Sequence, residues 1–212
     1  MSAGQPARRP GRPSSGARER ILEAGLETLL ADGYAGLTTT KVAVRAGENK
    51  ALISYHYGSK DGLVAAAAAE LGDRITREAL AGLGGARTAR GIATRLLRAV
   101  WEMLERDERV GRLYFDLNAV SVVEDEVRDA LRAVKDRWRG VLTGLLADAG
   151  VPARRVGPAT VLIIAGVEGL VLERLERGDN PELTAGCRLF AEAVGSVAGA
   201  EPRAARRAEA LP

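Results

Sequence analysis

The sequence predicts an all-α protein, and three observations carry this prediction. From about Ala17 onward, apolar residues recur at spacings of three and four, the pattern of one face of a helix. Glycine, proline and Asx residues interrupt the pattern at intervals that suit helices of ordinary length. We find no convincing run of alternating polar and apolar residues, which a half-buried strand requires.

The composition predicts a globular, cytoplasmic protein. Hydrophobic residues make up 46% of the 212 residues, enough for a real core. No apolar run approaches the roughly 18 residues of a membrane span, and the N-terminal segment lacks the order of a secretory signal. A single cysteine, Cys187, leaves no intramolecular disulfide and fits a reducing compartment. We therefore expect no membrane partner.

The basic excess is confined to the N-terminal third of the chain. Residues 1–63 contain 9 Lys and Arg against 6 Asp and Glu, whereas residues 64–212 contain 22 of each. The whole net charge of +3 therefore lies in the first segment. A local basic excess is what the neutralisation of nucleic-acid phosphates requires.

The N-terminal elements begin with a flexible basic arm over residues 1–16, which is rich in Pro, Gly, Ser and Arg and has almost nothing to bury. A helix is expected over residues 17–31, where an apolar stripe lies opposite three glutamates. Asp32-Gly33-Tyr34 is expected to stop this helix.

Two short helices are expected next. Thr39 or Thr40 can cap a helix that ends at Gly47, and Asn49 can cap another that runs to about Tyr57. Short helix, tight turn and short polar helix form the arrangement that places side chains in a DNA major groove.

Longer helices are expected beyond Ser59, which can cap the first of them. Ser121-x-x-Glu124 matches a capping box for the fourth, and Asn180 can cap the last. Residues 201–212 are expected to be a frayed, charged tail. The expected helices lie near residues 60–82, 88–106, 108–119, 122–149, 155–178 and 181–199.

A helix-turn-helix pair needs an apolar interior and a polar outward face on its second helix. The expected interior residues are Val42, Ala43, Ala46, Ile53 and Tyr57, with Leu26, Leu29 and Leu63 beneath them. Counting around the helix from Ile53 and Tyr57, the outward positions are Lys50, Ala51, Ser54 and Tyr55.

These outward residues suit contacts to DNA. Lys50 can donate to guanine O6 and N7, or neutralise a phosphate. Ala51 and Leu52 suit contact with a thymine methyl group. The remaining side chains are donors that reach phosphate oxygens: Ser54, Tyr55, His56 and, with the free amides of its helix N-terminus, Lys60.

The segment AGENKALISYHYGSKDGL, residues 46–63, resembles the recognition region of the TetR family of transcriptional repressors. The resemblance covers about the first 65 residues, with a weaker match at residues 167–170. Two departures are Ala51 for the common glycine and Ser54 for the common phosphate-contacting tyrosine, so Tyr55 is a candidate to supply the phenol instead. The resemblance implies DNA contacts at Thr39, Thr40, Lys50, Ala51, Leu52, Tyr55, His56 and Lys60.

The arm contains Arg9 and Arg12 within the sequence RRPGRP. This segment resembles the short Gly-Arg-Pro hook that lies in a narrow A·T minor groove. The alternative is a disordered tail whose arginines raise only nonspecific affinity and salt dependence.

The last two helices are expected to form a homodimer interface, as the resemblance implies. One helix-turn-helix reads few base pairs, so two copies reading two half-sites supply specificity. The alternative is that these helices are buried within a monomer. The expected interface residues are Leu162, Ile163, Leu170, Leu183, Phe190 and Val194.

The middle helices are expected to hold a small-molecule pocket, because the few aromatic residues cluster there beside isolated polar ones. The alternative is that these residues are ordinary core. The candidates are Trp101, Leu104, Tyr114, Phe115, Asn118, Trp138, Leu142, Val167 and Glu168.

We expect neither an enzyme nor a cofactor, because the sequence has no zinc-site spacing, nucleophile elbow, Walker loop or dinucleotide fingerprint. The predicted parts are an arm (1–16), a helix-turn-helix DNA-binding domain (17–63), an effector-binding and dimerisation domain (64–200) and the tail. The predicted function is a repressor released from a palindromic operator by a small-molecule effector. The alternative is an architectural or weakly specific DNA-binding protein without an effector.

Overall fold

The computed structural model describes residues 16–199, and the regular structure of this range is helical throughout. Arg9, Arg12 and the tail lie outside the described residues. The helices are α1 (Ala17–Gly36), α2 (Thr39–Ala46), α3 (Ala51–Tyr57), α4 (Lys60–Gly82), α5 (Ala89–Arg106), α6 (Glu108–Val120), α7 (Asp125–Asp148), α8 (Ala153–Arg177) and α9 (Pro181–Gly199).

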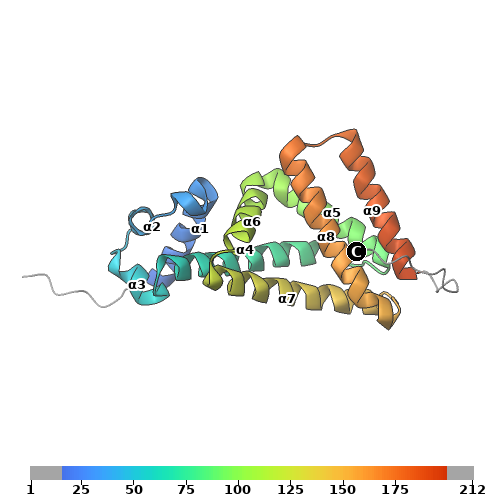
Figure 1. Ribbon diagram of the computed structural model, residues 1–212, viewed down its shortest axis with the longest axis horizontal. Helices are drawn as coiled ribbons and strands as arrows, with labels where there is room; N and C mark the ends of the chain where they lie inside the picture. The colour runs from blue at the N-terminus through green and yellow to red at the C-terminus, as the bar shows by residue number, and fades with distance from the viewer. Residues whose placement is uncertain (1–15, 200–212) are drawn as a thin grey trace, which may run out of the picture.

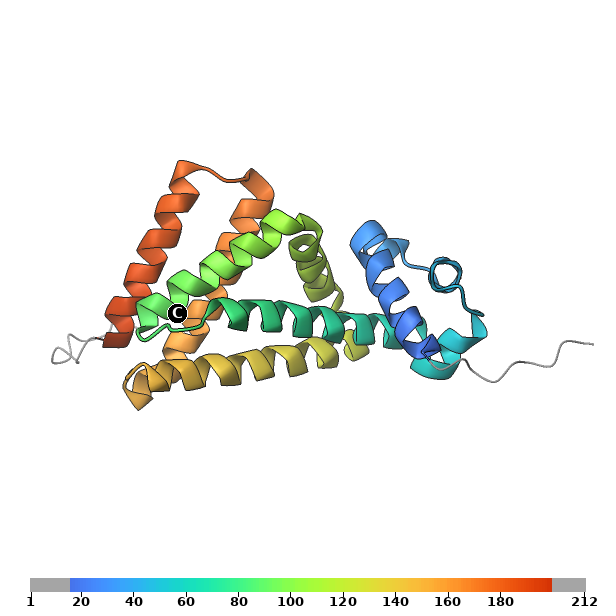
Figure 2. The same ribbon diagram turned by 180° about the vertical axis from the view of Figure 1, so that it is seen from behind.

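The helices form a small head and a larger body (Figures 1 and 2). We call α1–α3 the head and α4–α9 the body. Helix α4 runs from the head along the body, side by side with α7, and α8 pairs with α9 at the far end. Helix α6 stands between the head and the α8–α9 pair, so it is placed to contact both.

The local signals at the head set its helix ends. Gly33 has φ +68°, which breaks α1 where the sequence predicted a stop, and Gly47 ends α2 with φ +65°. The predicted cap of α2 at Thr39 or Thr40 is wrong. Thr38 is the cap, because its extended backbone lets its hydroxyl accept the Lys41 amide at 3.2 Å.

Of the other predicted helix caps, those at Asn49 and Ser59 are confirmed and the one at Ser121 is wrong. Asn49 Oδ1 accepts the Ala51 amide at 2.8 Å, and Ser59 Oγ accepts the Gly62 amide at 2.8 Å, as predicted. The capping box at Ser121 is wrong. The chain continues turning after α6, so the Ser121 hydroxyl donates back to the Asn118 carbonyl at 2.6 Å instead of capping α7.

Two hydrophobic clusters stabilise the fold, one at the head and its junction with the body and the other within the body. The head cluster joins α1–α3 to the start of α4 and to apolar side chains of α6 and α7. The body cluster joins α4, α5 and α7–α9. The predicted head interior is confirmed, with buried Leu26, Leu29, Val42, Ala43, Ile53 and Leu63 and partly buried Ala46 and Tyr57 packed against them.

Helix α8 corrects one expectation about membranes. By length and composition it is apolar enough to cross a bilayer, with a mean hydropathy of 1.7, although no such run was expected from the sequence. Here α8 packs on α7 and α9, and it carries Glu168 toward a cavity. One such helix is weak evidence for a membrane span, because core helices pass the same test.

Candidate DNA-binding face and ligand cavity

The outward face of α3 is polar and accessible. Ile53 is 1% exposed in the head cluster, whereas Lys50, Ala51, Ser54 and Tyr55 are all exposed. The Tyr55 side chain is 72% exposed, which is high for an aromatic residue. A short helix with one face fixed in the core and the other free is therefore present where the sequence predicted it.

Other predicted contact residues are less accessible. Leu52 is half-buried against the head cluster, so its side chain is partly committed to packing. His56 is also half-buried, and its Nε2 is buried without a hydrogen-bond partner among the described residues. At the start of α2, Thr40 is exposed and Thr39 half-buried.

Two contacts that sequence reasoning missed hold α3 and its turn on α1. Arg20 Nε donates to Glu48 Oε1 at 3.0 Å, and the Glu48 side chain is only 12% exposed. The Tyr57 hydroxyl donates to the Arg18 carbonyl at 2.6 Å. Because these contacts join the turn before α3 and the last residue of α3 to α1, they fix the orientation of the outward face.

Lys60 lies where the head meets the body. Its ammonium nitrogen is 4.2 Å from the centre of the Tyr34 ring, a cation–π contact. The Tyr34 hydroxyl lies 3.1 Å from Asp61 Oδ1 and 3.4 Å from Glu124 Oε1. Burial and these two carboxylates raise the pKa of Tyr34 to about 12. Lys60 is thus held by the head–body junction rather than extended into solvent.

Helix α6 also holds the head. The Tyr34 amide donates to Asp116 Oδ2 at 2.9 Å. Tyr114 and Phe115, the two residues before Asp116, line the cavity described next. One helix therefore contacts the cavity and the head with adjacent residues.

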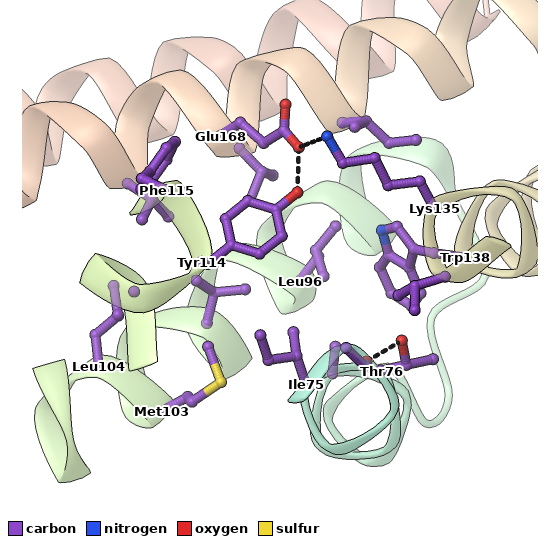
Figure 3. Close-up of a pocket in the computed structure, with 18 of the residues that line it drawn as sticks. Ile75, Thr76, Leu96, Met103, Leu104, Tyr114, Phe115, Lys135, Trp138 and Glu168 are labelled. Atoms are coloured by element: carbon purple, nitrogen blue, oxygen red, sulfur yellow. Dashed lines mark hydrogen bonds and ion pairs between the residues drawn. The ribbon is translucent and has the colours of Figure 1, made fainter. Parts of the chain in front are cut away.

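A cavity of about 220 Å³ lies in the body between α4, α5, α6, α7 and α8 (Figure 3). Its walls are mainly apolar, as in small-molecule sites generally. Its aromatic walls are Tyr114, Phe115 and Trp138, and its charged side chains are Lys135, Arg139 and Glu168.

A polar cluster lies on one side of the cavity. The Tyr114 hydroxyl donates to Glu168 Oε1 at 2.5 Å, and Lys135 Nζ lies 3.8 Å from the same oxygen. Lys135 also donates to Asn118 Oδ1 at 2.6 Å. Burial, then the Glu168 charge, raises the pKa of Tyr114, so its hydroxyl stays a neutral donor. Among the described residues, no group of three or more His, Cys, Asp or Glu could hold a metal ion.

Three of the predicted pocket residues do not line the cavity. Trp101 is drawn away, because its Nε1 donates to Asp179 at 3.2 Å. Leu142 is fully buried in the body cluster. Asn118 is outside the lining and bonds to two lining residues, because its Nδ2 donates to the Tyr114 carbonyl at 2.7 Å and its Oδ1 accepts from Lys135 at 2.6 Å. The predicted residues that do line it are Leu104, Tyr114, Phe115, Trp138, Val167 and Glu168.

Sequence reasoning missed most of the cavity, including Lys135 and Arg139. The available signal was the placement of two cations one turn apart on α7, on either side of Trp138. The other missed residues include Ile75, Thr76, Leu96, Val100, Ile164 and Val171.

The predicted dimer residues are divided between core and surface. Ile163, Leu183 and Val194 are buried within the single chain, which corrects those three predictions. Leu162 is 37% exposed, and Leu170 and Phe190 are half-buried. The exposed side of α8 instead carries an apolar stripe, which comprises Val161, Leu162, Ala165, Gly169 and Leu172.

Known proteins share both the motif and the fold. The profile of the family described as bacterial regulatory proteins, tetR family, matches residues 21–67. Over 155 residues the chain is 24% identical to the nicotine-responsive transcriptional repressor HdnoR of Paenarthrobacter nicotinovorans, covering 70% of this chain and 80% of the repressor. A TetR-family regulator from Rhodococcus sp. is 27% identical, with a TM-score of 0.69 over 87% of this chain and 100% of that one. The multidrug binding protein EbrR, complexed with imidazole, shares the fold at 22% identity and a TM-score of 0.67, over 90% of this chain and 96% of that one.

The head and its relatives define the class of protein. Two helices joined at Gly47, with a buried side and a polar outward side on the second, make a helix-turn-helix DNA-binding unit. The matching proteins are transcriptional regulators. Residues 21–67 thus form a DNA-binding unit of the kind found in the TetR family of bacterial transcriptional regulators, whose model they match, and the matching proteins are regulators of this type.

Proposed function

We propose that this cytoplasmic protein is a sequence-specific repressor, which binds a palindromic operator as a homodimer and is released by a small-molecule effector. The proposed parts are the arm (1–16), the DNA-binding domain (17–63), the effector-binding and dimerisation domain (64–200) and the tail (201–212). The observation that carries the proposal is the outward face of α3, which is exposed while the opposite side of the helix is buried in the head cluster.

On DNA, α3 enters the major groove with Lys50 at the base edges. Lysine is suited to guanine O6 and N7, and the adjacent Ala51 is small enough to meet a thymine methyl group. Ser54, Tyr55 and His56, with Thr39 and Thr40 of α2 and Lys60 of α4, donate to backbone phosphates. Leu52 contributes chiefly by packing behind the helix.

The exposed apolar stripe of α8 is the dimer interface of this proposal. The five residues recur on one side of the helix, and small Ala165 and Gly169 let a second helix approach closely. A closed pair of chains then presents two heads to two half-sites related by the same symmetry.

The cavity receives the effector, and α6 transmits its presence. Tyr114 and Phe115 line the cavity, and Asp116 accepts the Tyr34 amide of the head. An effector that favours one position of α6 therefore favours one position of the head. If the two heads of the dimer are then separated by a distance that does not match the two half-sites, the affinity for the operator falls. The name of the relative HdnoR, a nicotine-responsive repressor, supports this kind of control.

DNase footprinting on the DNA upstream of its own gene, with purified protein, tests the proposal. A protected palindrome that candidate metabolites release is the expected result. Protection without sequence preference, with equal salt-dependent affinity for scrambled DNA, would instead indicate the architectural alternative.

A further inference from the structure

We propose that the effector is an apolar acid of medium size, whose anionic group lies at Lys135 and Arg139. The inference rests on the proposed function of the cavity as the effector site. It adds the chemical class of the ligand, which is set by the charges of the lining.

The lining carries an excess of positive charge. Its charged residues are Lys135, Arg139 and Glu168, which sum to +1. A charge brought into a largely apolar cavity is costly unless an opposite charge pairs with it. A cationic ligand would raise the local sum to +2, whereas a monovalent anion would bring it to zero.

Glu168, the only carboxylate in the lining, already has its partners. Both the Tyr114 hydroxyl and the Lys135 ammonium contact its Oε1. Figure 3 shows these two contacts converging on one oxygen, with the second oxygen directed away from both partners. The carboxylate is therefore engaged by the protein and is poorly placed to receive a ligand cation.

Arg139 is the cation available to a ligand. It is exposed, one helical turn from Lys135, and it forms no hydrogen bond or ion pair with the described part of the chain. Its neighbour Arg137 differs, because it pairs with Asp73 on α4 at 2.5 Å and does not line the cavity. An exposed guanidinium in the lining of the cavity suits the planar fork of a carboxylate.

The interior sets the size and the apolar character of the ligand. A volume of 220 Å³ holds about seven water-sized groups at about 30 Å³ each. The inner walls include Ile75, Leu96 and Met103, which offer no charge. A chain of about seven carbons, or one aromatic ring with a short linker, fits this space.

Isothermal titration calorimetry with three probes of equal length tests the ligand class: octanoate, octanol and octylammonium at neutral pH. Octanoate is expected to bind more tightly than either of the others by about tenfold, a difference of about 1.4 kcal/mol. Arg139→Gln should remove most of this advantage and leave octanol binding unchanged. Arg137→Gln is the matched control and should leave all three affinities unchanged. Glu168→Gln should strengthen octanoate, because it removes the one negative charge.

Several outcomes would overturn the inference. They are octylammonium binding as tightly as octanoate, no measurable binding of octanoate, or an octanoate affinity that Arg139→Gln leaves intact while circular dichroism shows a folded variant. The proposed function fails separately. If octanoate binds through Arg139 but leaves operator affinity unchanged, the ligand class stands and the release mechanism is wrong.

Discussion

Lys50 and Lys60 have different surroundings, and these predict different effects on DNA binding. Lys50 is exposed immediately before α3, whereas Lys60 lies against Tyr34 at the start of α4. Lys50→Ala should relax specificity at one position of each half-site, at a cost of about 1–3 kcal/mol. Lys60→Ala should weaken binding to all sequences about equally and reduce the salt slope by about one. Fluorescence anisotropy over a salt series, on matched and mismatched DNA, measures both effects.

Arg106, a body cation paired with Glu78, provides the control. Arg106→Ala should change neither specificity nor slope. If Lys50→Ala and Lys60→Ala behave like this control, α3 has been wrongly assigned as the recognition helix.

Tyr34 gives the head–body junction a pH dependence. Its pKa is raised from 10 to about 12, so the folded protein holds the phenol proton more tightly than the unfolded chain does. This contribution to stability is complete below pH 10 and is lost as the pH rises from 10 to about 12. Tyr34→Phe should therefore show a smaller fall in unfolding free energy across that window, measured by urea denaturation at a series of pH values. Identical profiles for the variant and the wild type would contradict the raised pKa.

At this scale the sequence predicted positions better than partners. Lys50 and Tyr55 are exposed as expected, because the helical period alone orients them around Ile53. The cap at Thr38 was missed because three consecutive threonines offer equivalent hydroxyls, and only backbone conformation separates them. Glu48 was missed because its partner Arg20 is distant in sequence.

The body depends on the close approach of long helices α4 and α7. Gly72 of α4 lies against buried Val134 of α7, and a Cβ at Gly72 would come within 2.4 Å of Val134 Cγ1. Gly72→Ala should therefore destabilise the fold by about 1–3 kcal/mol through overpacking. Gly140→Ala, on the open side of α7 with nothing within 4 Å, should instead stabilise by up to about 1 kcal/mol. Urea midpoints for the two variants measure the difference, and equal midpoints would contradict the packing.

The apolar stripe of α8 predicts the oligomeric state. Val161 is 52% exposed, so Val161→Glu should fold normally yet place a charge in the proposed interface. We expect the dissociation constant of the dimer to rise at least about tenfold in analytical ultracentrifugation. Leu80→Glu, a 36% exposed position on α4, is the control and should remain dimeric. A wild-type monomer, or a Val161→Glu dimer of unchanged affinity, would exclude this interface.

Helix boundaries were largely predictable, but helix faces were not. The range predicted for α9 is the range observed, because Asn180-Pro181 marks its start. Helix α8 is apolar on most of its circumference, so the sequence could not separate its buried Ile163 from its exposed Val161. Only the packing of α7 and α9 against it decides which side is left open.

The whole molecule connects a cavity in the body to the head through α6. The sequence predicted the two ends of this connection, the polar helix and an aromatic pocket. It did not predict the cavity lining, because five helices converge there and no local pattern encodes which of their faces meet. The hydrogen bond from the Tyr34 amide of α1 to Asp116 of α6 joins residues that are far apart in the sequence. It therefore also follows only from the fold.

Selection of binding sites from a random DNA pool is the sharpest test that two chains read DNA sequence through α3. If α3 of each of two chains reads a half-site, the wild-type protein should enrich a palindrome with half-sites whose spacing matches whole turns of DNA. The same selection with Lys50→Ala should lose preference at one position in each half-site. Enrichment of no common sequence, or of the same palindrome by both proteins at equal strength, would contradict the account.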